Sequence, residues 1–131
     1  MKNKKFTLLM MEFTQLVQGS SLLLDENHAL LCDFDEMSCR IEDGVRVGLN
    51  DSILIMISMG GGPFQSEVAL RINADFSLSS DGYIAQFQSE EYFFVRGIPL
   101  PEHPQALLKT LSNTLDIAKT LKQELSLHVA N

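Results

Sequence analysis

The sequence predicts an α+β fold in which an antiparallel sheet packs with three helices, in the order α-β-β-β-α-β-β-α. Two patterns carry this prediction. Apolar residues recur at every third or fourth position near both ends of the chain and once in the middle, as in helices, whereas short runs rich in Leu, Val and Ile lie between turn residues elsewhere. With 131 residues, the chain is long enough for one core and too short for two, so we expect a single domain over residues 1–131.

The first helix is predicted over residues 4–18. Its apolar side chains follow one another at spacings of three and four, which places them in one stripe that ends near Gly19. The stripe consists of Phe6, Leu9, Met10, Phe13, Leu16 and Val17.

Residues 22–59 are predicted to form three or four antiparallel strands. Turn signals at residues 25–27, 43–44 and 50–51 separate the apolar runs. Residues 45–49, between the last two turns, carry an additional strand-like pattern. The run at residues 53–57 is apolar at every position, so we expect it to be the central strand, covered on both faces.

The second half of the chain is predicted to contain a short helix, a hairpin and a long helix. Val68, Ile72 and Phe76 are four residues apart and indicate a helix over about 64–76. Residues 82–87 and 92–95 flank a polar turn and are rich in aromatics, as in a hairpin. Pro104 suits the first turn of the last helix, in which apolar residues recur regularly as far as Leu125.

The charge of the chain argues against nucleic acids and anionic membranes as partners. The formal net charge is −7 and the sequence pI is about 4.8, whereas phosphate groups require clustered Lys and Arg. Eight of the 17 acidic residues lie between residues 25 and 51. Such a run is typical of a solvated face and less often of a docking surface for a basic partner.

The sequence indicates a cytoplasmic protein. The apolar stretch after Lys5 is interrupted by Glu12 after six residues, which is short for a secretory signal, and no stretch approaches the length of a membrane span. Cys32 and Cys39 provide no disulfide framework, so a reducing compartment is the simplest interpretation.

No pattern predicts a metal or a cofactor. The glycines at residues 60–62 are followed by Pro63, which removes a backbone amide, and no lysine follows to meet a phosphate. A structural zinc requires four ligands, whereas His28, Cys32 and Cys39 are three. A buried apolar thiol explains Cys32 more simply.

Catalytic motifs are missing as well, so we do not expect an enzyme. The chain has no G-x-S-x-G nucleophile turn, and the acidic pairs at residues 33/35 and 90/91 lie in or beside polar turns, where carboxylates are solvated. A small α+β enzyme that acts through His28 or Cys32 remains the less favoured alternative.

The order of elements, together with three local segments, resembles a known family. Residues 22–27 (LLLDEN) look like a link from a first helix into the first strands, residues 70–76 (LRINADF) are similar to a second helix, and a hairpin over 82–100 precedes an amphipathic final helix. Over nearly its whole length the chain resembles the class I chaperones of bacterial type III secretion systems, the family related to the Tir chaperone. The strand-like run at residues 45–49 departs from that pattern.

The resemblance implies a homodimer that holds the N-terminal chaperone-binding segment of a secreted effector in extended form, without ATP. It places the second helix and the hairpin at the dimer interface, with Ile72, Phe76, Tyr83 and Phe87 as the expected contacts. The expected partner-binding residues are Phe6, Leu9 and Phe13 of the first helix and Leu24, Phe34 and Ile55 of the sheet. Each of these apolar residues also fits the core of its own chain. A regulatory protein of the same fold that sequesters another secretion component is the remaining alternative.

Overall fold

The computed structural model describes residues 4–17, 23–24, 29–34, 36–60, 64–87 and 91–127. Its elements, in chain order, are α1 (Lys4–Val17), β1 (Leu23–Leu24), β2 (Leu30–Phe34), β3 (Met37–Asp43), the 3₁₀ helix η1 (Gly44–Val47), β4 (Ser52–Gly60), α2 (Ser66–Ala74), α3 (Phe76–Ser79), β5 (Tyr83–Gln86), β6 (Tyr92–Pro99) and α4 (Pro104–Leu127). The strands form one antiparallel sheet in the order β1-β2-β3-β4-β6-β5. The predicted α+β class is confirmed, and the elements follow the predicted order except that four strands precede α2 and the additional helix α3 follows it.

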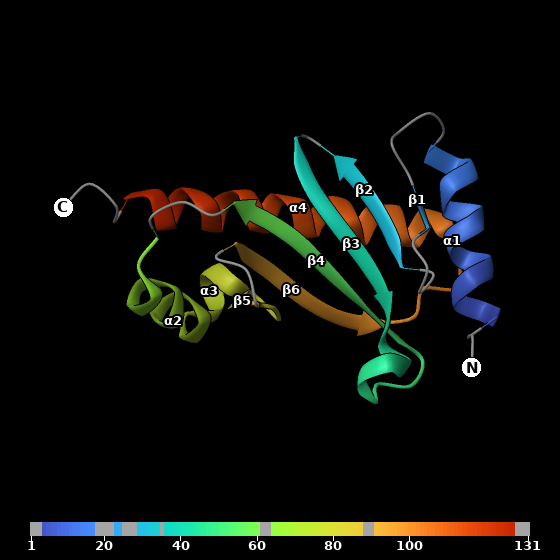
Figure 1. Cartoon of the computed structure of the whole chain (residues 1–131), viewed down its shortest axis with the longest axis horizontal. Coiled ribbons are helices and arrows are strands. Elements are labelled where there is room, and N and C mark those ends of the chain that lie inside the picture. The colour runs from blue at the N-terminus through green and yellow to red at the C-terminus, as the bar shows by residue number, and fades with distance from the viewer. Residues whose placement is uncertain are drawn as a thin grey trace.

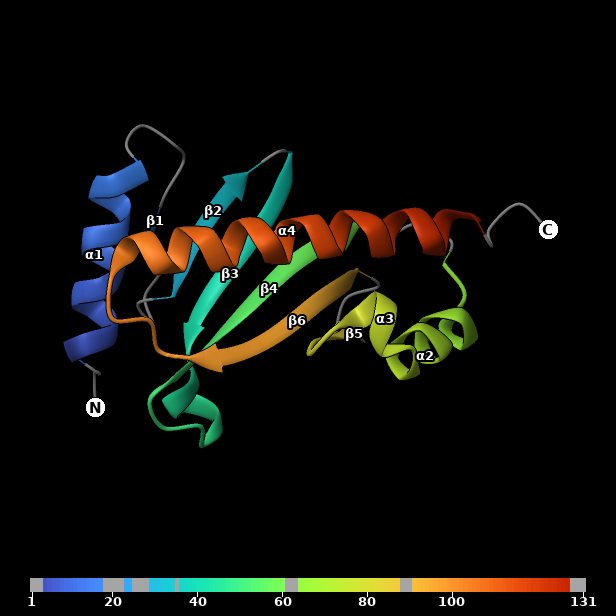
Figure 2. The same ribbon diagram turned by 180° about the vertical axis from the view of Figure 1, so that it is seen from behind.

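Helix α4 runs along one face of the sheet, and α1 lies across the end where α4 begins (Figures 1 and 2). Figure 1 shows the opposite face of the sheet without a helix over it, and α2 and α3 lie beside β5 near the other end of the molecule. The core fills the space between the sheet, α1 and α4. From α4, the core residues are Leu107, Leu111, Leu115, Ala118, Leu121 and Leu125.

Strand β4 occupies the interior position that its sequence predicts, between β3 and β6. Ile53, Ile55 and Ile57 alternate along the strand and are fully buried on the face toward α4. On the other face, Met56 is also buried, whereas Leu54 is only partly covered. The uninterrupted apolar run therefore reflects burial on one face and partial burial on the other.

The predicted second helix is divided in two by Asp75. Its backbone is extended (φ −96°, ψ 92°), which ends α2, and its carboxylate accepts a hydrogen bond from the Ser77 N–H at 3.1 Å, which caps α3. The molecule thus contains a short additional helix that the apolar spacing did not predict. Phe76 begins this helix instead of ending the previous one.

The strand-like run at residues 45–49 does not form a strand; it forms η1 and the turn after it, in the connection between β3 and β4. The Asp43 carboxylate accepts a hydrogen bond from the Val45 N–H at 3.1 Å, and Gly48 takes a left-handed conformation (φ 83°) that ends the helix. At Gly44, a Cβ would lie 2.7 Å from the Leu49 carbonyl oxygen, so the turn requires glycine there. These local bonds outweigh the β-propensity of Val45 and Val47.

The expectation that Cys32 is a free buried thiol is wrong, because Cys32 and Cys39 are joined by a disulfide. Both side chains are buried. The reason lies in the antiparallel register: Phe34 pairs with Met37, so Cys32 and Cys39 face each other on β2 and β3. The two cysteines are seven positions apart in the sequence and become direct neighbours in the sheet.

Candidate functional site

Helix α1 carries apolar residues on two faces. The inward row, Phe6, Leu9, Met10 and Phe13, is buried in the core of this chain. The expected partner-binding residues Phe6, Leu9 and Phe13 all belong to this row, and each leaves at most 4% of its surface accessible.

The outward row of α1 consists of Leu8, Met11 and Leu16, and these side chains are exposed. Leu8 leaves 58% of its surface accessible. The sequence interpretation assigned Leu16 to the buried stripe and overlooked Leu8 and Met11. Their spacing of three, outside the main stripe, is the signal that identifies them.

The three expected contacts from the sheet have different surroundings. Ile55 is fully buried beneath the helices. Phe34 is half-buried, with its ring edge-on to Phe13 at a centroid distance of 6.4 Å. The backbone of Leu24 pairs with Leu30 between β1 and β2, and the side chain of Leu24 lies outside what the structure describes.

A groove lies beside the first half of α1. Its volume is about 390 Å³, and its residues come from α1, from the turn before β4 and from the connection between β6 and α4. The lining residues are Lys5, Leu8, Leu9, Glu12, Asp51, Leu100, Pro101 and Glu102, and we name them the α1 groove. The Leu100 N–H donates to the Asp51 carbonyl at 2.8 Å, which joins two walls of the groove.

The opposite end of the molecule exposes a second group of apolar side chains, Leu70, Phe76, Tyr83 and Phe87, which we name the aromatic end. Phe76 is the most exposed of them, at 76%. Three of the four expected dimer contacts therefore lie on the surface, whereas the fourth, Ile72, is buried.

The free edge of β5 is closed by a side chain of α2. The Ile84 N–H donates to Oδ1 of Asn73 at 2.6 Å, and Nδ2 of Asn73 donates to the Ile84 carbonyl at 3.0 Å. At the other edge of the sheet, β1 pairs only with Leu30 and Leu31. Within the described ranges, no strand pairs with the outer side of residues 32–34.

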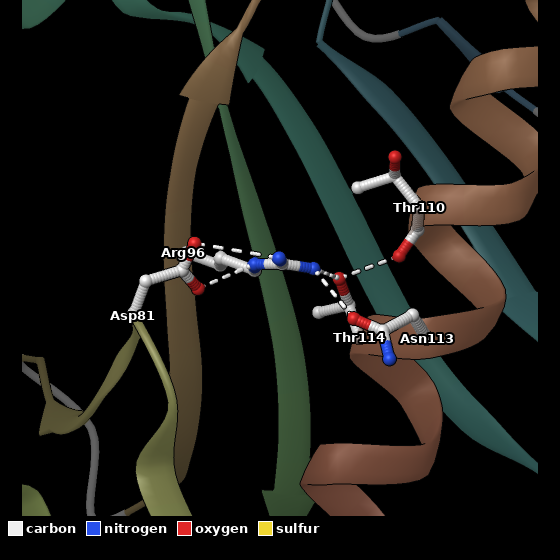
Figure 3. Close-up of polar contacts among 5 residues, drawn as sticks. All are labelled: Asp81, Arg96, Thr110, Asn113 and Thr114. Atoms are coloured by element: carbon white, nitrogen blue, oxygen red, sulfur yellow. Dashed lines mark hydrogen bonds and ion pairs between the residues drawn. The ribbon is translucent and has the colours of Figure 1, made fainter. Parts of the chain in front are cut away.

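Arg96 of β6 connects the aromatic end to α4 (Figure 3). Its Nε and Nη2 donate to the two carboxylate oxygens of Asp81, at 2.6 and 3.3 Å. Nη1 donates to Asn113 Oδ1 and Thr114 Oγ1, both at 3.0 Å, and Thr114 in turn donates to the Thr110 carbonyl. Because the guanidinium is planar, one side chain holds the turn before β5 and the middle of α4 in a defined geometry.

The described part of the chain contains no cluster of side chains suited to bind a metal ion. No three His, Cys, Asp or Glu side chains within it lie close enough together to hold a metal ion. Of the two residues that the enzyme alternative invoked, Cys32 is bonded to Cys39 and His28 lies outside the described ranges. None of the helices in those ranges is long and apolar enough to span a membrane.

No protein-family model and no curated protein sequence matches the chain. Solved structures do. A chain of the HopA1–SchA chaperone–effector complex matches with a TM-score of 0.70 and 11% identity, over 90% of this chain and 93% of that one. A chain of the ExsC–ExsE complex matches with a TM-score of 0.70 and 21% identity, over 92% and 93%. The Yersinia pestis type III secretion chaperone SycH, solved with a stable fragment of YscM2, matches with a TM-score of 0.62 and 17% identity, over 88% and 98%.

The fold is that of the class I type III secretion chaperones. The likeness covers 88% or more of both chains in each comparison. The resemblance of the sequence to this fold is thereby confirmed, although at most 21% of the aligned residues are identical.

Proposed function

We propose that this chain is a bacterial cytoplasmic type III secretion chaperone, acting as a single domain. In this role it binds the N-terminal chaperone-binding segment of a secreted effector and keeps it competent for secretion without ATP and without catalysis. The main support is the full-length likeness to chaperones whose structures were solved with a bound effector or protein fragment. The exposed apolar side chains at the two ends of the molecule fit such a role.

The client segment binds along α1 and the open edge of the sheet. Burying the accessible half of a side chain such as Leu8 or Met11 contributes about 0.8–1.5 kcal/mol. Ordering an extended segment costs about 2–5 kcal/mol, so one anchor is not enough. Backbone pairing at the outer side of residues 32–34 and several apolar anchors in the α1 groove together overcome this cost.

The dimer forms through the aromatic end. Phe76, Tyr83 and Phe87 supply the large exposed side chains that dominate protein interfaces. Ile72 is buried in the core of its own chain and anchors α2 there. Because Asn73 occupies the edge of β5, the two protomers meet through side chains and not by joining their sheets.

Capture of the partner from the native bacterium tests the proposed function. The tagged full-length chain is cross-linked in cells, and the bound protein is identified by its mass. We expect a secreted protein whose binding is lost when its N-terminal segment is deleted. Capture of another chaperone or a transcription factor would instead support the regulatory alternative and contradict the effector role.

A further inference from the structure

We propose that the α1 groove selects client segments in which an apolar side chain is flanked by Lys or Arg. This inference rests on the proposed function and adds the chemistry of the segment that is recognised.

The floor and lip of the groove are apolar. Leu9 forms a buried floor, Leu8 stands exposed at the lip, and Leu100 and Pro101 are half-buried between them. The volume of about 390 Å³ lies within the usual range of ligand pockets and accommodates a large aliphatic or aromatic side chain. The hydrogen bond between Leu100 and Asp51 holds the two walls in place before a client arrives.

The rim of the groove is acidic. Glu12, Asp51 and Glu102 are exposed carboxylates from three different elements, and Lys5 is the one cation among the lining residues. An apolar hollow with this rim is complementary to a segment that carries positive charge beside its anchor. The stem of a lysine or arginine also packs along exposed leucines while its charge stays near the rim. A segment with acidic residues beside the anchor is repelled, which provides selectivity.

A pair of labelled peptides tests this inference. Both contain a central run of four leucines, flanked on each side by two lysines in one peptide and by two glutamates in the other. Binding to the full-length chain is measured by fluorescence anisotropy at low ionic strength. We expect the lysine peptide to bind at least about fivefold more tightly, with a preference that weakens as salt is added.

Two charge-reversal variants distinguish the effect of the rim carboxylates on binding from the effect of the net charge of −7. The double variant Glu12→Lys/Glu102→Lys removes two rim carboxylates, and the control Glu67→Lys/Asp116→Lys makes the same change in net charge at exposed sites on α2 and α4. We expect the rim variant to lose the preference and the control to keep most of it.

In the peptide measurements, three results overturn the inference: equal binding of the two peptides, no binding of either, or equal loss of preference in both double variants. The proposed function is judged separately, on the captured secreted protein. If that protein binds the rim variant as tightly as the unmodified chain, the inference fails and the secretion role stands.

Discussion

The side-chain amide of Asn73 forms hydrogen bonds with both backbone groups of Ile84, as acceptor at 2.6 Å and as donor at 3.0 Å. In an edge strand of four residues, these two groups form the middle of the edge. A carboxamide from α2 therefore takes the place of a neighbouring strand. At the opposite edge, no strand among the described residues pairs with the outer side of residues 32–34.

Asn73→Ala is expected to lower the free energy of unfolding by about 2 kcal/mol, because two backbone groups lose their partner. The Ile84 amide should also exchange its hydrogen faster. Urea denaturation and hydrogen exchange measure the two effects. Arg71→Ala, at an exposed position on the same helix, is the control. Equal effects of both substitutions would show that Asn73 does not hold the edge.

Arg96→Lys is expected to cost about 1–2 kcal/mol of stability, since one ammonium cannot reach Asp81 and Thr114 together. The Asp81 carboxylate is 57% exposed, so solvent screening keeps the effect modest. A double-mutant cycle with Thr114→Val isolates the contact to α4. Arg40→Lys, in the partly exposed pair with Glu42, should change stability by less than about 0.5 kcal/mol. A negligible coupling energy would contradict the bridging role of Arg96.

Leu8 and Leu9 are neighbours in sequence, but truncation should lower the stability of the chain only at Leu9. Leu9→Ala is expected to destabilise the chain by about 2–5 kcal/mol, because it leaves a cavity in the core. Leu8→Ala should leave stability within about 0.5 kcal/mol and weaken client binding instead. Thermal denaturation and client titration together distinguish the two. A stable Leu9→Ala variant would mean that α1 is not anchored by its inward row.

Substitution at the aromatic end tests the proposed dimer. Light scattering of the unmodified protein should give about twice 14.6 kDa at micromolar concentration. Phe76→Glu places a charge at the centre of the interface and should weaken dimerisation about a hundredfold or more. Leu127→Glu, at an exposed position near the end of α4, should leave the dimer intact. If the unmodified protein is strictly monomeric, this result contradicts the proposed dimer and argues against the proposed function.

The sequence by itself determined the elements whose signals are local or strictly periodic. Pro104 starts α4, and the apolar spacing that follows defines its buried stripe. The uninterrupted apolar run at residues 53–57 of β4 correctly predicted an interior strand. In each case the neighbouring residues alone specify the backbone or the buried face, so one sequence was sufficient.

Only the tertiary structure decided which apolar residues remain for a partner. Leu8 and Leu9 are chemically the same, and they differ because α4 and the sheet cover one side of α1. The disulfide between Cys32 and Cys39 depends on the strand register, and the closed edge of β5 depends on Asn73 from a separate helix. These outcomes follow from contacts between segments distant along the chain, whereas residue spacing reports only which side chains share a face.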